Sequence, residues 1–207
     1  MATPDGPDGS DDLPPTRWET GPKGTYAERF ASLIAEGADV DGEARLADAL
    51  VQRGARILDA GSGIGRVGAT LAARGHDVIC VEKDAELVAE SRRRYPGLEV
   101  VESDLLALPD LDLGAPFDLV VLVGNVLVLL APATEQRLLA AVRDVLAPTG
   151  RVLVGFHAQD GPTSARAYPY AEFAADVAAA DLTVQHRFGT YELAAPSDDY
   201  TVAVLSR

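Results

Sequence analysis

The stretch ILDAGSGIGRVG, residues 57–68, contains a glycine-rich loop that fits two known registers. Counted from Gly63 it ends in G-x-G-x-x-G, the fingerprint of dinucleotide-binding proteins. Counted from Asp59 it is an acidic residue followed by G-x-G-x-G. In a dinucleotide site the first glycine directly follows the strand, whereas four residues separate Leu58 from Gly63. The register from Asp59 is therefore favoured, and a carboxylate at the strand end suits a cationic ligand better than a pyrophosphate.

Strand and helix patterns alternate on both sides of this loop. The apolar runs predict strands at 56–60, 77–82, around 100–101, 117–123, 151–156, 182–193 and 200–206, the last two forming a hairpin. The helical spacings predict helices at 26–36, from Asp41 to about 50, 65–73, 84–95, 134–146 and 167–180. Such alternation is typical of an α/β fold with a mostly parallel sheet and helices on both faces. Its ligands lie beyond the carboxyl ends of the strands, so the residues that follow each strand are the candidate site.

Composition narrows the range of partners. The chain has 207 residues, a hydrophobic share of 47% and a formal net charge of −14, which argues against binding to nucleic acid. The longest apolar run, residues 119–131, is too short to span a membrane. The single cysteine, Cys80, lies in an apolar run and is expected to be buried, which suits a reducing cytoplasm. The three histidines lack ligand spacing, so no metal site is expected.

Several motifs follow the loop in a fixed order. The segment VICVEKD ends a predicted strand at Glu82, and VVESDLLALP places Asp104 and Leu105 after the next one. The strand FDLVV leads to Gly124 and Asn125, and a helix, the turn LAPTGR and the strand VLVGF come after it. Together with ILDAGSGIG, this order resembles the class I S-adenosylmethionine-dependent methyltransferases from about residue 41 to residue 207. The resemblance implies a doubly wound, Rossmann-like sheet of seven strands, with the last strand antiparallel.

The resemblance also implies a cofactor and its binding residues. The cofactor is S-adenosylmethionine, and S-adenosylhomocysteine is the product. Glu82 is expected to bind both ribose hydroxyls, Asp104 to face the adenine amino group, and the Gly124-Asn125 loop to line the methionine end. The full set of expected cofactor contacts is Asp59, Ala60, Gly61, Ser62, Gly63, Gly65, Glu82, Lys83, Asp104, Leu105, Gly124 and Asn125.

The acceptor side is less defined. Residues 1–16 are expected to be a disordered acidic tail before a single domain, 17–207, in which 17–52 form a helical lid and 53–207 the core. Trp18, Tyr26 and Arg29 of that lid, and His157 after a strand, are candidates for the substrate side. His157 is the one candidate for a general base, and a purely structural role at the strand end is the competing interpretation. Tyr26 is equally compatible with packing.

The substrate is expected to be a small molecule, because only about ten residues separate the fifth strand from the last helix. The loop GNVLVLL also lacks the Asn/Asp-Pro-Pro-aromatic run of enzymes that methylate nucleic-acid bases. Two alternatives stay open. An NAD(P)-dependent oxidoreductase would use the Gly63 register, although no Tyr-x-x-x-Lys pair is present. A non-catalytic protein that binds S-adenosylmethionine would need no acceptor site. The oligomeric state is not predicted.

Overall fold

The computed structural model describes residues 14–22, 32, 36–114 and 116–207. The predicted acidic tail lies outside these residues except for positions 14–16. Most of the predicted helix at 26–36 also lies outside them, and so do Tyr26 and Arg29.

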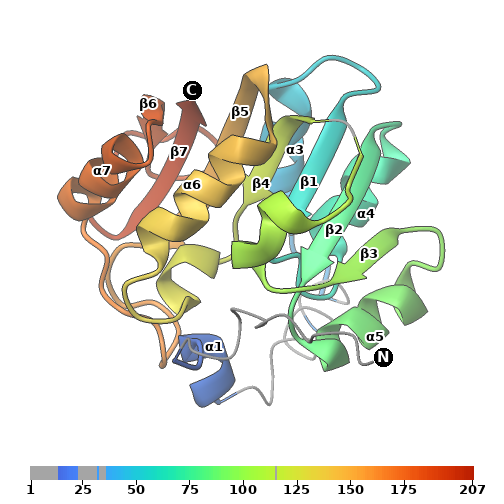
Figure 1. Cartoon of the computed structure of the whole chain (residues 1–207), viewed down its shortest axis with the longest axis horizontal. Coiled ribbons are helices and arrows are strands. Elements are labelled where there is room, and N and C mark those ends of the chain that lie inside the picture. Colours follow the sequence, from blue (N-terminus) through green and yellow to red (C-terminus); the bar gives the residue numbers. More distant parts are fainter. Residues whose placement is uncertain (1–13, 23–31, 33–35, 115) are drawn as a thin grey trace, which may run out of the picture.

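The described residues form one seven-stranded sheet in the order β3-β2-β1-β4-β5-β7-β6 (Figure 1). The strands are β1 Arg56–Ala60, β2 Asp77–Glu82, β3 Glu99–Glu102, β4 Phe117–Leu122, β5 Leu146–His157, β6 Thr183–Phe188 and β7 Tyr200–Ser206. Strands β1 to β5 pair in parallel, and β7 runs antiparallel to both β5 and β6. This confirms the predicted fold class, including the reversed last strand.

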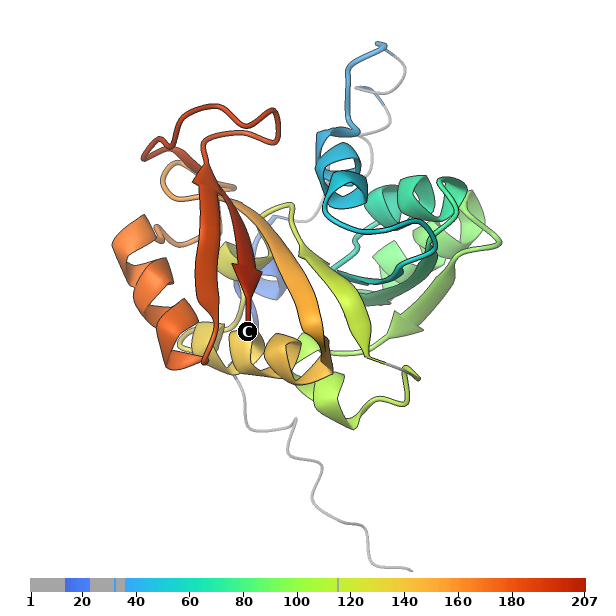
Figure 2. The ribbon, with the colours of Figure 1, turned by 90° about the horizontal axis from the view of Figure 1, so that it is seen from above.

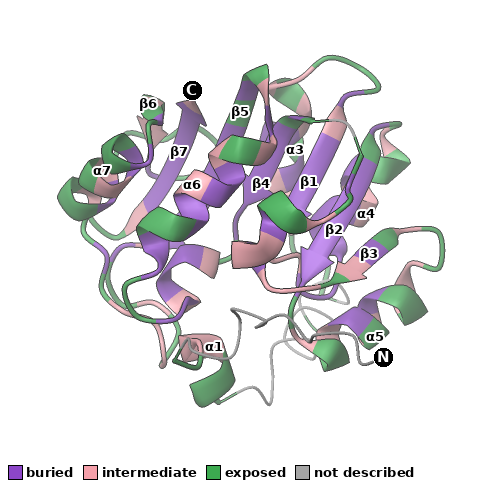
Figure 3. Cartoon of the chain, viewed as in Figure 1, coloured by how far each residue is buried: buried purple, intermediate pink, exposed green. Residues whose placement is uncertain are grey.

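Helices cover both faces of the sheet (Figure 2). One face carries α3 Gly42–Ala49, α4 Arg66–Ala73 and α5 Ala85–Arg94. The other carries α6 Glu135–Val145, α7 Tyr170–Ala179 and the 3-10 helix η1 Leu105–Asp110. Neighbouring strand residues alternate between these layers, so that Ile57 packs in the first core and Leu58 in the second. The inner strands β1, β2, β4 and β7 are buried almost throughout, whereas most residues of the edge strands β3 and β6 are half-buried or exposed (Figure 3). None of the described helices is long and apolar enough to cross a membrane.

Helix α4 lies very close to the sheet at Gly68. A Cβ added to Gly68 would lie 2.5 Å from the Cys80 sulfur on β2 and 3.1 Å from the Asp59 carboxylate on β1. Gly68 is therefore a packing glycine inside a helix. The dinucleotide register counted from Gly63 has no support in this arrangement.

Several boundaries differ from the prediction. Strand β5 begins at Leu146 rather than Arg151, because Leu146 already pairs with Phe117 before an irregular stretch leads to regular pairing from Arg151. Strand β6 ends at Phe188, where the chain turns and the Gly189 N–H donates to the Ala194 carbonyl.

Three short helices were not predicted. The 3-10 helices η1 and η2 (Val126–Leu129) are too short to carry a helical period. The third, α1 (Arg17–Thr20), begins with a capping box in which Thr16 and Glu19 bond each other's main chain. The T-x-x-E spacing of Thr16 and Glu19 is a recognisable signal for that helix start.

Candidate active site

The carboxyl ends of the parallel strands meet at one edge of the sheet. Strand register brings them level: Ala60 pairs with Val81, Asp59 with Val121, and Leu122 with Val154. Helix α1 lies beyond this edge (Figure 1), where the Arg17 guanidinium donates to the Leu130 carbonyl at 2.9 Å. The residues that follow β1, β2, β4 and β5 therefore share one site.

The loop after β1 depends on its glycines. Gly61, Gly63 and Gly65 have φ values of +76°, +56° and +77°, a left-handed region that costs other residues roughly 1–2 kcal/mol. A Cβ on Gly61 would also lie 2.5 Å from a methyl group of Val126. The loop after β4 therefore packs directly on the loop after β1. Only a glycine leaves room for this contact at position 61.

Asp59 lies at the centre of the site and is 2% exposed. One carboxyl oxygen accepts a hydrogen bond from the Gly68 N–H at 2.8 Å, in the first turn of α4. Burial raises the pKa of the Asp59 carboxyl to about 7, against the opposing effect of that hydrogen bond. The carboxyl group thus joins the end of β1 to the first turn of α4, and it can also change its charge near neutral pH.

Glu82 ends β2 and holds the loop from the other side. Its carboxylate accepts main-chain hydrogen bonds from Gly63 at 2.8 Å, Lys83 at 2.8 Å and Asp84 at 2.9 Å. Burial raises the pKa of Glu82, and these three N–H groups act in the opposite direction. A carboxylate accepts about four hydrogen bonds, so Glu82 retains acceptor capacity for a hydroxyl group.

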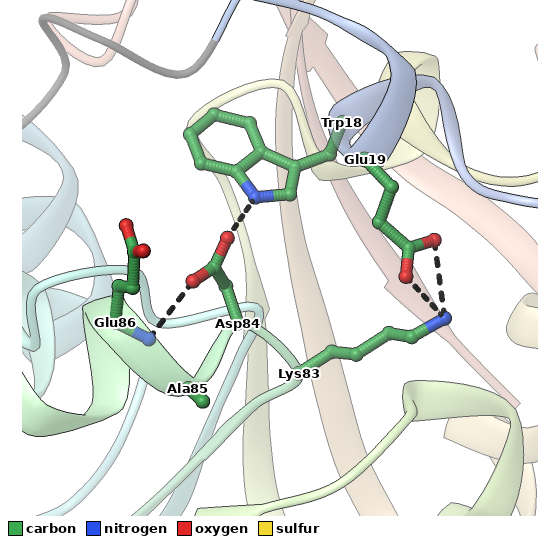
Figure 4. Close-up of a pocket in the computed structure, with 6 residues that line it drawn as sticks. All are labelled: Trp18, Glu19, Lys83, Asp84, Ala85 and Glu86. Atoms are coloured by element: carbon green, nitrogen blue, oxygen red, sulfur yellow. Dashed lines mark hydrogen bonds and ion pairs between the residues drawn. The ribbon is translucent and has the colours of Figure 1, made fainter.

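A pocket of about 270 Å³ opens beside the end of β2, between α1 and α5 (Figure 4). The Trp18 indole N–H donates to Asp84 at 2.8 Å. The Lys83 ammonium lies 3.3 Å from Glu19 and 3.1 Å from Asp104. Helix α1 is therefore attached to the same edge that carries Glu82.

Asp104 lies near this pocket and makes two contacts with neighbouring residues. It caps η1 through the Leu106 N–H at 2.9 Å and pairs with Lys83. Leu105 is buried behind it, as Ala60 is behind the glycine loop.

A second cavity, of about 20 Å³, lies between the loops after β1 and β4. Its lining includes Asp59, Gly61, Ser62 and Gly124. The Ser62 hydroxyl is buried with no hydrogen-bond partner among the described residues. This unmet hydroxyl, beside the Asp59 carboxyl, leaves a polar group at the end of β1 that a ligand with a hydroxyl or cationic group could satisfy.

Asn125 and His157 meet at the ends of β4 and β5. Oδ1 of Asn125 lies 2.8 Å from the main-chain nitrogen of His157 and 3.0 Å from its Nδ1. The Tyr200 ring packs almost perpendicular to the imidazole, with centroids 4.7 Å apart. Asp59, Gly61, Ser62 and Gly124 of the predicted cofactor set line the smaller cavity, and Lys83 lines the larger one together with Trp18. Asn125 and His157 contact each other where β4 and β5 end.

Sequence reasoning did not select Asp84, Glu19 or Val126 as site residues. Asp84 begins the predicted helix at 84–95, and it caps α5 through the Glu86 N–H at 3.0 Å. No sequence signal pairs Asp84 with Trp18 or places Val126 on Gly61. Among the described residues there is no His, Cys, Asp and Glu cluster able to hold a metal ion.

Comparisons with known proteins agree with this geometry. The chain matches the family model of a methyltransferase domain over residues 57–150. A comparison with curated protein sequences finds no match.

Several solved structures are similar to this chain over a longer part of its length than the family model matches. A TehB-like SAM-dependent methyltransferase from Corynebacterium glutamicum is 34% identical, with a TM-score of 0.76 over 88% of this chain and 96% of that one. A 1,6-didemethyltoxoflavin-N1-methyltransferase from Burkholderia thailandensis is 25% identical, with a TM-score of 0.60 over 86% and 85% of the two chains. The CcbJ methyltransferase from Streptomyces caelestis is 20% identical and shares the fold, with a TM-score of 0.69 over 80% and 89%.

The glycine loop, the acidic residues at the ends of β1 and β2, the strand order and these similarities all lead to one family. The chain belongs to the S-adenosylmethionine-dependent methyltransferases, and S-adenosylmethionine is its cofactor.

Proposed function

We propose that this enzyme methylates a small-molecule acceptor and that its cofactor lies across the edge formed by β1, β2 and β4. The bound cofactor supplies a methyl group already activated on a sulfonium, ready for in-line displacement. The protein's task is to align the acceptor with that methyl group and to exclude water, an orientation effect worth several kcal/mol.

The polar groups of the edge suit the separate parts of this cofactor. Glu82 retains acceptor capacity for a ribose hydroxyl, and Asp59, once ionised, complements a cationic group beside the glycine loop. Lys83, Asp104 and the Trp18 pocket then lie on the adenosine side. Gly124 and Asn125 lie on the side where β5 ends, which we assign to the methionine portion and the acceptor.

The observation that carries the small-molecule assignment is the short connection between β5 and α7. Only residues 158–169 separate them, and Ala158 and Tyr168 within that segment are buried. This leaves no separate lobe for a macromolecular substrate among the described residues. Support also comes from the net charge of −14, which disfavours nucleic acid, and from the relative that acts on 1,6-didemethyltoxoflavin.

The test uses S-adenosylmethionine with a tritiated methyl group and a cell extract as the source of acceptors. After incubation with the full-length enzyme, the extract is separated into small-molecule, protein and nucleic-acid fractions. We expect label in the small-molecule fraction and matching release of S-adenosylhomocysteine. Label confined to protein or nucleic acid would refute the proposal.

We also propose a cytoplasmic location, in keeping with a single buried thiol at Cys80. Fractionation of cells that express the full chain tests this, and recovery outside the cytoplasmic fraction would contradict it.

A further inference from the structure

Asn125 and His157 are hydrogen-bonded to each other where the neighbouring strands β4 and β5 end. Leu122 of β4 pairs with Val154 of β5, and both Asn125 and His157 follow three residues after that pair. The Asn125 N–H also donates to the Gly155 carbonyl at 3.2 Å. Both side chains are half-buried at the edge that carries the glycine loop.

The contacts determine which way the Asn125 amide faces. Its side-chain atom nearest to β5 lies 2.8 Å from the main-chain nitrogen of His157. That main-chain N–H can only donate, so the atom facing it must be the carbonyl oxygen and not the NH2 group. The amide orientation therefore follows from chemistry and does not depend on the assignment of the two side-chain atoms.

The same oxygen determines where the imidazole proton lies. Oδ1 of Asn125 has no proton to give and lies 3.0 Å from Nδ1 of His157. Nδ1 must therefore be the donor, and the neutral ring carries its proton there, with its lone pair on Nε2. In water the neutral imidazole of histidine favours the opposite tautomer, so the protein imposes this one.

Two further features hold the arrangement rigid. Asn125 has a φ of +75°, a left-handed conformation that asparagine tolerates better than most residues. Its main-chain carbonyl accepts a hydrogen bond from the Val128 N–H at 3.2 Å. Tyr200 pairs with His157 across β5 and β7, and its ring packs against the imidazole.

We infer that Asn125 is a positioning residue that keeps the proton of His157 on Nδ1 and so makes Nε2 the basic nitrogen of the ring. Nε2 is then the atom that takes up the proton which an O–H or N–H acceptor loses as it is methylated. This assignment rests on the proposed function, since only methyl transfer to such an acceptor needs that base.

The tautomer can be measured without knowing the acceptor. The full chain is labelled with ring-15N histidine, and two-bond 1H–15N correlation spectra identify which ring nitrogen carries a proton. The chain has three histidines, so the spectrum of His157→Gln assigns the signals of His157. Spectra are recorded at about pH 8.5, roughly two units above the ordinary histidine pKa.

Two variants at position 125 separate positioning from structure. Asn125→Gly keeps the left-handed backbone without strain and removes Oδ1. Asn125→Asp keeps an acceptor oxygen at the same place. We expect the Nδ1–H form of His157 in the wild type and in Asn125→Asp. In Asn125→Gly the tautomer ratio should shift by about fivefold to tenfold toward Nε2–H, as the loss of one ordinary hydrogen bond implies.

The outcomes are distinct. A wild-type ring protonated on Nε2, or an unchanged ratio in Asn125→Gly alongside lowered thermal stability, would overturn the inference and leave a structural role for Asn125. Calorimetry with S-adenosylhomocysteine on the same samples keeps the two proposals apart. Failure to bind it would count against the proposed function, whereas the tautomer spectrum decides the role of Asn125.

Discussion

Binding of S-adenosylhomocysteine should expel a proton from Asp59. Burial raises the pKa of this carboxyl to about 7 in the free protein. At pH 6 roughly nine in ten molecules are therefore protonated at Asp59, and at pH 8 roughly one in ten. A cationic group of the ligand, placed beside the carboxyl, favours its ionised form and lowers its pKa.

The magnitude follows from this titration. If the bound state returns the pKa of Asp59 to its ordinary value near 4, binding releases about 0.9 proton at pH 6, about 0.5 at pH 7 and about 0.1 at pH 8. The apparent affinity should accordingly rise about tenfold between pH 6 and pH 8, because less ligand binding energy is used to ionise the carboxyl.

The assay is isothermal titration calorimetry at pH 6 in two buffers that differ in ionisation enthalpy. Asp59→Asn is the matched control, since its side-chain oxygen still accepts from the Gly68 N–H but the group cannot titrate. We expect release of about one proton in the wild type, and a flat affinity without release in the variant. Equal release in both proteins would place the proton elsewhere, and no release from the wild type would refute the reasoning.

The same carboxyl affects the stability of the free protein. Its folded-state pKa is about 7 and its unfolded value is near 4, so the folded state holds the proton more tightly. The free energy of unfolding should therefore fall as pH rises from about 4 to about 7, and Asp59 should account for about 3 kcal/mol of loss over that range. Urea unfolding of Asp59→Asn should lack that portion of the slope, and identical slopes in both proteins would contradict it.

Three other predictions concern the same edge. Gly61→Ala should lower the free energy of unfolding by about 1–2 kcal/mol because of its φ of +76°, and by a further amount because the new methyl group would clash with Val126. In thermal unfolding, adding Val126→Ala should recover only the loss caused by the clash, and equal losses in the single and double variants would exclude the clash. Trp18 is the only tryptophan, so the tryptophan fluorescence of the protein reports on α1 alone. S-adenosylhomocysteine should change this fluorescence, and Asp84→Ala, which removes the hydrogen bond to Trp18, should remove most of the change. An unaltered wild-type spectrum would show that α1 is not part of the binding site. His157→Gln should lower kcat by about 10²–10⁴-fold toward an O–H or N–H acceptor while the affinity for S-adenosylhomocysteine stays unchanged, and an undiminished kcat would exclude His157 as the base.

Much of the fold could be predicted from local sequence. The ranges of β1, β2 and β7 match the predicted strands, because alternation and turn residues act within a few positions of the chain. The register of the glycine loop was also predictable, since the position of Asp59 after an apolar pair places Gly68 inside a helix. The structure confirms that Gly68 packs against β2.

Other features depended on pairing over longer range. Strand β5 extends back to Leu146 because Phe117 offers it a partner, although Pro148 and Gly150 signal a turn. Asp104 was expected only to face a ligand, but it also caps η1 and pairs with Lys83. Such a side chain can bond the nearest main-chain N–H whatever else it contacts, so its surroundings cannot be deduced from its position after a strand.

The sequence alone therefore determines the order of the elements, the glycine loop and the acidic residues that end the strands. Tertiary structure decides which side chains meet. Asn125 and His157 are 32 positions apart, and Trp18 and Asp84 are 66 apart. Their contacts depend on the register of β4 against β5 and on where α1 attaches. The pKa of Asp59 near 7 likewise arises from burial by the whole fold, because only a folded chain removes water from a carboxyl group.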